Sequence, residues 1–594
     1  MHSERFTIKA KSRIAELYNP QAVFYVACIA VGVGGALAAI ILKNSIGYLE
    51  QSLRDAVSSR NLNIFILALP PIGILLTVLF TNRIVKDDLS HGVTKVLAAI
   101  STKGGIVSGK MIWAPLVGCI ITVGFGGSVG MEAPIMHSGS AIGSKIGRVL
   151  GLNYRQRVLM VGCGTAAAVA AIFKAPIAGA LFAIEILMID LTNQSVIPLL
   201  ISSVTGAMLA KVFTGQDIEF VFAVYNHFDY RNTIFYILLG LICGLIAEYI
   251  RHIQKSIGRV FHRIPSIYTR ALTGGLALVP LVLLFPPLFG EGYSGMRSML
   301  TGHADELLAN SPFFGMSSQN LIFVCYIALF ILFKGAATAI TGAAGGVGGV
   351  FAPSLFMGSA AGFVVARVLK IAGIGFASEL NFSLVGMAGV LSALLKAPLT
   401  SIFLIAEITG GYALLIPLIV TSGVAYVVGR FFCPYSIYAE DLANRRELVT
   451  HHKDRAALAL MNPDSLIDSN FPVIPPDAPI PMLLSVALGS RKSTVAILDE
   501  EEHLLGTIRF DKVRNVLLAR GELSDYRASD IAEPVKDIIP PGTNMSEVLA
   551  LFEETNAEEI PCVRGDGKFV GFINRSRAFE AYRNQVMDLS EDKE

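Results

Sequence analysis

The chain has 594 residues, of which 53% are hydrophobic and only 16% are charged. Soluble domains usually carry about 25% charged residues, so the composition excludes an ordinary soluble protein and indicates one that crosses a membrane many times. The formal net charge of +2 gives no sign of a nucleic-acid partner or of an acidic one.

Residues 1–20 are expected to form a basic amphipathic segment on the cytoplasmic face of the membrane. Its cations, which alternate with apolar side chains, are Arg5, Lys9, Lys11 and Arg13. Positive charge before a first span is typical of the cytoplasmic side. The apolar run 22–42 that follows is too long for the core of a cleaved signal peptide, so we expect it to be the first span.

Uncharged runs long enough to cross most of a hydrocarbon layer about 30 Å thick recur along the chain. They are 22–42, 64–80, 111–131, 232–247, 271–288 and 313–333. Several other apolar segments are short and interrupted by Gly and Pro. The seven cysteines are scattered without a Cys-x-x-Cys pair, which argues against a metal or redox site.

The membrane part repeats itself. Ala133-Pro134 and Gly139-Ser140-Ala141 recur 219 residues later as Ala352-Pro353 and Gly358-Ser359-Ala360, and Lys174-Ala175-Pro176 recurs 222 residues later as Lys396-Ala397-Pro398. The repeat predicts two homologous halves, at about 60–210 and 270–430. Halves of this kind in transporters are often inverted and meet through broken helices near the bilayer midplane. We expect an inverted repeat, although the sequence leaves a parallel one open.

Glu132 is the leading candidate for a functional residue. It follows the glycine-rich run 126–130 at the expected start of an apolar helix. A bare helix N-terminus attracts anions because its first amides lack partners and its dipole is positive there. A glutamate at that place can occupy the anion site itself, and an ionisable group in lipid is a functional candidate by default. The alternative is a buried acid with a structural role.

The second half offers the matching helix start. Val350 and Phe351 follow another glycine-rich loop, so their amides are expected to face the midplane as those of Met131 and Glu132 do. Two positive helix ends would then converge on one anion. Close packing of helices through small residues is the alternative explanation of these glycines, above all Gly139, Gly143, Gly358 and Gly362.

Hydrophobicity stops near Phe432, and a charged, proline-containing region follows. We expect a membrane domain over 21–445, a linker over 446–471, a small domain over 472–584 and an acidic tail over 585–594. The small domain repeats the order Pro-Pro, helix, β pair, helix. Its expected helices and strands are 480–488, 494–498 and 504–508 in the first copy, and 545–552, 559–563 and 569–573 in the second.

Together these residues resemble the CLC family of chloride channels and proton-coupled chloride exchangers, and the C-terminal tandem resembles a pair of CBS modules. The segments Gly130 to Pro134 and Gly349 to Pro353 carry the resemblance. It implies an all-α polytopic membrane domain with an inverted repeat, followed by a small α/β tandem CBS domain. It also implies a homodimer with one anion pathway per subunit, no enzymatic activity and no cofactor.

The resemblance assigns roles to these helix starts. It implies that Glu132 is the gating glutamate. It also implies that the residues around the two helix starts hold chloride, which is the transported substrate; these are Met131, Ala133, Val350 and Phe351.

Two further elements are expected to contact the ion. The segment 87–94 resembles a family loop in which a serine hydroxyl contacts chloride. One register gives that role to His91, which we favour, and a register shifted by one gives it to Ser90. After the last span, Tyr438 fits the family tyrosine whose hydroxyl bonds the ion, and Tyr435 is the alternative.

The mode of transport is predicted from Ile186. Family exchangers usually carry an internal proton-accepting glutamate immediately after the acid that Glu185 matches, and Ile186 fills that position here. This favours a passive channel. Asp190 is a substitute acceptor one turn further on. Met131 replaces the usual cation beside the gating acid, which weakens the local positive field and makes protonation of Glu132 easier.

Alternatives remain for function and ligands. Chloride/proton exchange through the same pore is one, and a non-conducting membrane sensor that serves the CBS pair is another. Other halides or nitrate are possible substrates because Thr94 replaces a family proline; fluoride export is not expected.

The CBS pair lacks the usual ribose-binding aspartates, which argues against a nucleotide, although Arg509, Lys512, Arg575 and Arg577 offer phosphate-binding charges. We expect a multi-pass protein of the plasma or inner membrane with both termini and the CBS pair in the cytoplasm.

Overall fold

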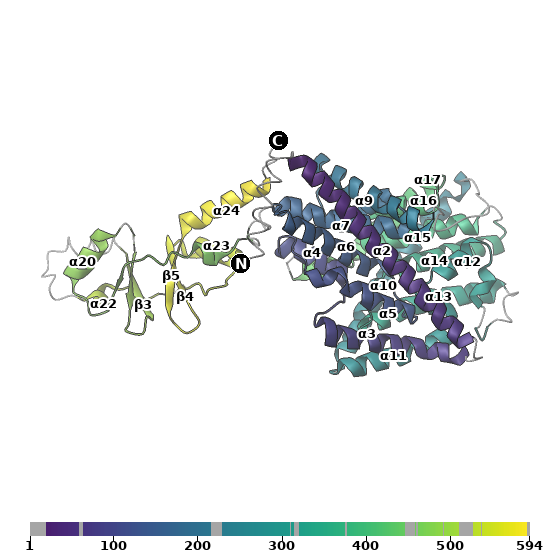
Figure 1. Ribbon diagram of the computed structural model, residues 1–594, viewed down its shortest axis with the longest axis horizontal. Helices are drawn as coiled ribbons and strands as arrows, with labels where there is room; N and C mark the ends of the chain where they lie inside the picture. The colour runs from purple at the N-terminus through teal and green to yellow at the C-terminus, as the bar shows by residue number, and fades with distance from the viewer. Residues whose placement is uncertain are drawn as a thin grey trace. The chain divides into compact units, whose positions relative to one another are not determined.

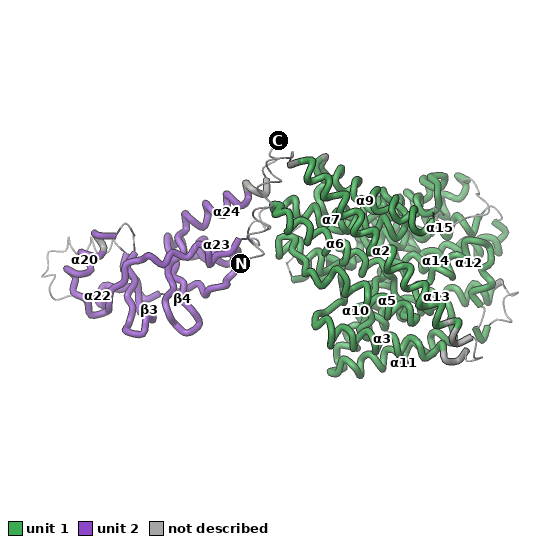
Figure 2. Tube along the Cα trace, in the orientation of Figure 1, with its two compact units in different colours: residues 1–448 green, residues 449–594 purple. Residues whose placement is uncertain are grey.

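The computed structural model divides the chain into two units, residues 1–448 and 449–594 (Figure 2). It describes residues 20–58, 63–215, 229–308, 311–313, 320–374, 377–445, 458, 461–490, 492, 494–509, 527–535 and 537–590. The expected basic segment up to residue 19, Lys512 and the last four residues of the tail lie outside this range. The division at 448 falls inside the expected linker.

Unit 1 is helical, and the long helix α2 crosses it (Figure 1). Its α-helices are α2 (Pro20–Ser58), α3 (Leu69–Phe80), α4 (Gly92–Thr102), α5 (Ala114–Gly124), α6 (Glu132–Val149), α7 (Tyr154–Phe173), α8 (Pro176–Glu185), α9 (Asn193–Thr214), α10 (Thr233–His262), α11 (Ile267–Leu284), α12 (Tyr293–Leu300), α13 (Asn320–Ala343), α14 (Phe351–Ile371), α15 (Glu379–Leu395), α16 (Pro398–Ile408), α17 (Leu415–Phe432) and α18 (Glu440–Asn444). Short helical turns are η1 (Asn63–Ala68), η2 (Thr81–Val85), η3 (Gly109–Ile112), η4 (Tyr230–Asn232), η5 (Pro286–Leu288) and η6 (Ala304–Leu308). Among the described residues, nine helices are long and apolar enough to cross a membrane.

The two halves form their helices through the same local signals. Lys174 and Lys396 adopt left-handed backbone conformations, with φ of 55° and 58°, and end α7 and α15. Pro176 and Pro398 then begin α8 and α16, where a missing amide hydrogen costs nothing. The long helices match as well, because α2 packs on α7 and α9 as α10 packs on α15 and α17.

Helices α8 and α16 show that the repeat is inverted. The Glu185 carboxylate at the end of α8 accepts hydrogen bonds from the amides of Leu399 and Thr400, at 3.1 and 2.7 Å. At the end of α16, the Glu407 carboxylate accepts bonds from the first amides of α8, those of Ile177 and Ala178, at 3.0 and 2.8 Å. Each helix therefore caps the other head to tail, so equivalent helices run in opposite directions. The expected inverted repeat is confirmed, and both acids have a structural role as caps of the opposite helix.

Glycines set the close approach of helices within each half. A Cβ on Gly139 would lie 2.3 Å from the Gly164 carbonyl oxygen, and one on Gly358 would lie 2.3 Å from that of Gly386. These contacts place α6 against α7 and α14 against α15 with their backbones almost touching. Small residues allow such packing in lipid, where hydrophobic burial does not drive helices together. The packing role of these glycines is therefore confirmed.

The uncharged run 111–131 is not one span, which corrects the simplest interpretation of its composition. Helix α5 ends at Gly124, and Gly126 takes a positive φ of 89°. The ring of Phe289 lies where a Cβ of Gly126 would be, at 2.1 Å, so only glycine fits this turn. The broken segment brings the start of α6 into the protein interior.

Unit 2 contains two copies of the same small motif. Its elements are η8 (Pro463–Leu466), β1 (Val473–Ile474), α20 (Ile480–Gly489), β2 (Thr494–Leu498), β3 (Leu504–Arg509), α22 (Ala528–Ile531), α23 (Met545–Thr555), β4 (Glu559–Val563), β5 (Phe569–Asn574) and α24 (Arg575–Ser590). Strand β1 pairs parallel with β2, which pairs antiparallel with β3, and in the second copy Ile539 pairs parallel with Cys562 of the β4–β5 hairpin. Strands β2 and β4 have the bounds expected from the sequence.

We predict that a methyl group at a helix crossing destabilises the protein. In Gly143→Ala the new Cβ would lie 1.9 Å from the Met160 carbonyl oxygen, and in Gly362→Ala it would lie 1.9 Å from that of Phe382. Overpacking of this kind typically costs about 1–3 kcal/mol. Thermal stability in detergent, followed by size-exclusion chromatography, measures the loss. Gly423→Ala is the control, because no atom lies within 4 Å of its Cβ; equal stability of all three variants would contradict the prediction.

Candidate functional site

The loops before α6 and α14 meet through a short antiparallel bridge. The Gly130 amide donates to the Gly349 carbonyl at 2.8 Å, and the Gly349 amide donates to the Gly130 carbonyl at 2.7 Å. Helix α6 begins at Glu132 and α14 at Phe351, two residues after each bridged glycine. The bridge thus holds the amino ends of two helices from different halves against each other, as the sequence predicts.

Glu132 lies between these two helix starts. Its side chain belongs to α6 and is buried, with 1% of the residue exposed. The Ala352 amide, in the first turn of α14, donates to Glu132 Oε2 at 3.4 Å. The hydroxyl of Tyr293, at the start of α12, donates to Oε1 at 2.6 Å. The carboxylate of one half therefore lies on the positive helix end of the other half, where a free anion would bind.

A cavity of about 590 Å³ lies beside this bridge. Five of the residues expected at the anion pathway line it together: Ser90, His91, Ala133, Val350 and Tyr438. The glycine-rich loop 344–349 lines it as well. Segments far apart in the sequence thus come together around one space next to the bridge at Gly130 and Gly349.

The loop before α4 presents both Ser90 and His91 to the cavity. The Ser90 hydroxyl donates to Asp88 Oδ2 at 2.9 Å and lies 3.0 Å from His91 Nδ1. The His91 backbone is left-handed and its side chain is exposed. Burial alone would raise the pKa of Asp88, but hydrogen bonds from Lys95 and Ser90 outweigh it and lower that pKa. The Ser90 hydroxyl is therefore already held by a carboxylate, whereas the His91 ring remains open to the cavity.

Tyr438 supplies the other polar group of the cavity. Only 8% of it is exposed, and its buried hydroxyl has no hydrogen-bond partner among the described residues. Tyr435, by contrast, is 41% exposed and does not line the cavity. Glu440 holds the segment in place through ion pairs with Arg251 and Lys255 of α10, at 2.9 and 2.5 Å. Tyr438 therefore lines the cavity with a hydroxyl whose hydrogen-bonding capacity is unused among the described residues.

Besides Glu132, three expected site residues lie outside the cavity lining. Met131 is the buried residue before α6, and Phe351 packs its ring against Phe173 with centroids 5.4 Å apart. Ile186 follows α8 and is 1% exposed. The position of the usual proton acceptor is therefore filled by a buried apolar side chain.

The structure adds residues that the sequence analysis missed. Besides Tyr293, the buried Lys334 of α13 donates to Ser128 Oγ and to the Gly290 carbonyl, both at 2.9 Å. This ammonium lies near the glycine-rich loop before α6, in a site where the family's cation beside Glu132 is replaced by Met131. The sequence does mark Lys334 as a candidate functional residue, because it is the only charged residue in the apolar stretch 320–343.

Comparison with known proteins agrees with this geometry. A family model described as "Voltage gated chloride channel" matches residues 72–430, which is well over half of the chain. The chain belongs to the CLC family. A CBS domain model matches residues 528–584. Membership in this family and the nine long apolar helices of the described residues make it a multi-pass membrane protein.

Its CLC relatives carry names of both transport modes. A putative chloride channel protein ClcB-like from Ralstonia nicotianae is 30% identical over 435 residues, covering 70% of this chain and 96% of the relative. The H(+)/Cl(−) exchange transporter ClcA from Vibrio cholerae is 26% identical over 373 residues, covering 60% of this chain and 75% of the relative.

Solved CLC structures share the fold. A slow cyanobacterial Cl−/H+ antiporter has a TM-score of 0.61 at 22% identity, covering 72% of this chain and 98% of that one. A eukaryotic CLC transporter has a TM-score of 0.59 at 18% identity, covering 93% and 97%.

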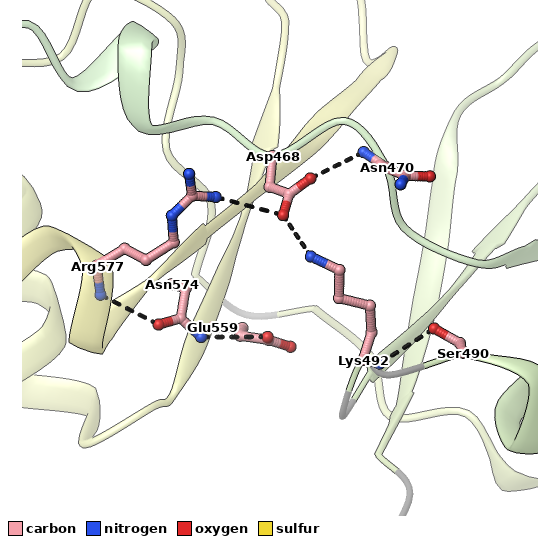
Figure 3. A network of polar contacts seen from close by, with 7 residues as sticks. All are labelled: Asp468, Asn470, Ser490, Lys492, Glu559, Asn574 and Arg577. Carbon is pink, nitrogen blue, oxygen red and sulfur yellow. Dashed lines mark hydrogen bonds and ion pairs between the residues drawn. The ribbon is translucent and has the colours of Figure 1, made fainter.

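In unit 2, two of the four cations considered for phosphate binding, Arg575 and Arg577, form hydrogen bonds within the unit. Asp468 accepts hydrogen bonds from Lys492, from Arg577 at 3.4 Å and from the Asn470 amide at 3.0 Å (Figure 3). Arg577 occupies the position at which CBS modules that bind nucleotides usually carry the ribose-binding aspartate. Arg575 donates to Asn556 at 2.6 Å. Lys492 of the first copy and Arg577 of the second are thus joined through Asp468, whereas the Arg575 bond lies within the second copy.

We predict that Asp468→Asn loosens these contacts at neutral pH. The hydrogen bond from Lys492 holds the pKa of Asp468 below its usual value. The carboxylate therefore stabilises the unit above its unfolded pKa of about 3.9, and this contribution is lost as the pH falls through the lower folded value. Because the side chain is partly exposed, we expect a loss of about 1 kcal/mol or less.

Hydrogen exchange of the full chain measures this effect. Residues 461–474 should exchange up to about fivefold faster in Asp468→Asn at pH 7, and the difference should vanish near the lower folded pKa. The exposed Asp537→Asn is the control. A difference that persists unchanged in acid would contradict the ionic origin.

Proposed function

We propose that the protein conducts chloride passively through a CLC-type pathway gated by Glu132. The observation that carries the proposal is the position of the Glu132 carboxylate on the Ala352 amide, at the positive end of α14. An ionised Glu132 occupies the place of the permeant anion and blocks it. Protonation removes the charge that holds the side chain there, and chloride then takes its place on the helix amides.

The cavity supplies the rest of the pathway. Val350 and Ala133 line it close to the gate, and the unpartnered Tyr438 hydroxyl and the exposed His91 ring offer hydrogen-bond donors further along. In this proposal chloride passes from the cavity to the start of α14, with Tyr438 and His91 or Ser90 as its contacts. Other halides or nitrate would use the same donors.

Chloride/proton exchange is the second candidate. It is favoured by the relatives named as exchangers, such as the Vibrio cholerae protein. The buried Ile186 favours passive conduction instead, because it carries no proton-accepting group at the position where family exchangers usually have one. A non-conducting sensor is the third candidate, and it leaves the anion-like position of Glu132 without a purpose.

We further propose a homodimer in the plasma or inner membrane, with the CBS pair and both termini in the cytoplasm. Exposed apolar side chains on α9 and α17, such as Val204 and Ile419, suit a lipid or subunit contact. Cytoplasmic placement rests on the basic residues that precede α2.

The variant Glu132→Gln tests the gate. Glutamine cannot ionise, so chloride efflux from proteoliposomes at pH 7.5 should rise about tenfold or more, since each pH unit above a titration midpoint lowers the protonated fraction tenfold. Efflux should also lose its dependence on pH. Asp305→Asn, which removes an exposed carboxylate of η6, is the control. Efflux as pH-dependent as that of the wild type would overturn the gating role.

The transport mode is tested by recording external pH during chloride efflux, with the voltage clamped by valinomycin. We expect efflux without proton uptake, because Ile186 replaces the internal carboxylate that usually accepts the proton in family exchangers. Proton uptake in a fixed ratio to chloride would establish exchange instead. Absence of efflux at every pH would favour the sensor.

A further inference from the structure

A second carboxyl group lies beside the gate, in the segment between α11 and α12. The Gly290 amide donates to the Gly126 carbonyl at 3.1 Å, and the Gly290 carbonyl accepts from Lys334 at 2.9 Å. Tyr293, three residues later, donates to Glu132. In the sequence, Glu291 therefore lies between Gly290, whose carbonyl binds Lys334, and Tyr293, whose hydroxyl binds Glu132.

The Glu291 carboxylate accepts fewer hydrogen bonds than the structural acids Glu185 and Glu407 do. Its Oε1 is buried and has no hydrogen-bond partner among the described residues, although the residue as a whole is partly exposed. Glu185 and Glu407 differ, because each accepts two backbone amides. A buried carboxylate oxygen without a donor is costly, so the group is suited to gaining and losing a proton.

Several charges act on Glu291. It interacts electrostatically with Glu132, Lys334, Lys43 and Glu50, and both it and Glu132 act on the buried Cys119 of α5. The two hydrogen bonds of Lys334 go to Ser128 and Gly290, not to the Glu291 carboxylate. Glu291 thus shares its surroundings with Glu132, and within the described part of the chain no ion pair fixes it.

Glu291 lies on the side of the gate opposite the cavity. Helix α11 begins at the cavity, which Ile267 and Arg270 line, and runs 18 residues to Leu284. A helix of that length extends about 27 Å, which places the segment after it across the protein from the cavity. Glu132 lies between the two sides.

We infer that Glu291 is a second proton-binding carboxyl, which passes protons between the solution opposite the cavity and Glu132. The inference rests on the proposed gating role of Glu132. The protonated Glu291 carboxyl gives its proton to the Glu132 carboxylate and regains one from water on its own side. Its negative charge also favours the protonated form of Glu132, because like charges repel each other. Glu291 is a positioning and relay residue, not part of the anion path.

The test is the pH dependence of chloride efflux by the full-length protein in liposomes, with the same pH on both sides. In Glu291→Gln the pH of half-maximal efflux should fall by about half a unit or more, because the like charge that favours protonated Glu132 is gone. Glu291→Asp keeps a carboxylate but withdraws it by one methylene, so a smaller shift in the same direction is expected. Asp305→Asn should keep the wild-type midpoint.

The possible outcomes separate this inference from the proposed function. If Glu132→Gln is independent of pH while both Glu291 variants keep the wild-type midpoint, the relay is wrong and the gate stands. If Glu132→Gln remains as pH-dependent as the wild type, the gate itself is wrong. Should Glu291→Gln fail to assemble, as judged by size-exclusion chromatography, the midpoint of Glu291→Asp decides: an acid shift supports the relay and a wild-type value overturns it.

Discussion

The amino ends of two helices, buried in one membrane unit and held together by the bridge between Gly130 and Gly349, are the constraint on which the site depends. Helix ends leave amides without internal partners, and in a lipid-embedded protein such groups need an acceptor. At α14 that acceptor is the carboxylate of Glu132 from the other half. At α8 and α16 it is the carboxylate that ends the opposite helix. The same need is thus met by structural acids at α8 and α16 and, at α14, by Glu132, the acid that we propose to be displaceable.

What separates these acids is the number of donors that hold them. Glu185 accepts two amides and the Thr400 hydroxyl, and Glu407 accepts two amides. Glu132 has one long amide bond and one bond from Tyr293. A group held by few donors is released at a smaller cost, because each lost bond to a charged group is worth about 1.5–3 kcal/mol. The contacts therefore favour movement of Glu132 and not of the other two.

Much of this arrangement could be predicted from sequence because it depends on local signals. Lys-Ala-Pro and the glycine-rich loops mark helix ends wherever they occur, and their recurrence reveals the two halves. Strands β2 and β4 follow equally local patterns. The partners of Glu132 could not be predicted in this way, because Tyr293 lies 161 residues away and Ala352 lies 220 away, and no local pattern joins such distant residues. The direction of the repeat likewise became clear only from the contacts between α8 and α16.

The charges around the gate explain why an apolar Met131 is compatible with the site. Lys334 of α13 supplies a buried ammonium near the same loop, and it binds Ser128 and Gly290 instead of the gating acid. The positive charge therefore acts on the side where Glu291 stands. The buried Ile186 offers no carboxylate at the position of the usual internal acceptor, whereas Glu291 interacts with Glu132 from the side opposite the cavity. This difference between the two sides suits the proposed gate, which would respond to protons from one solution, because a carrier needs carboxylate acceptors on both sides.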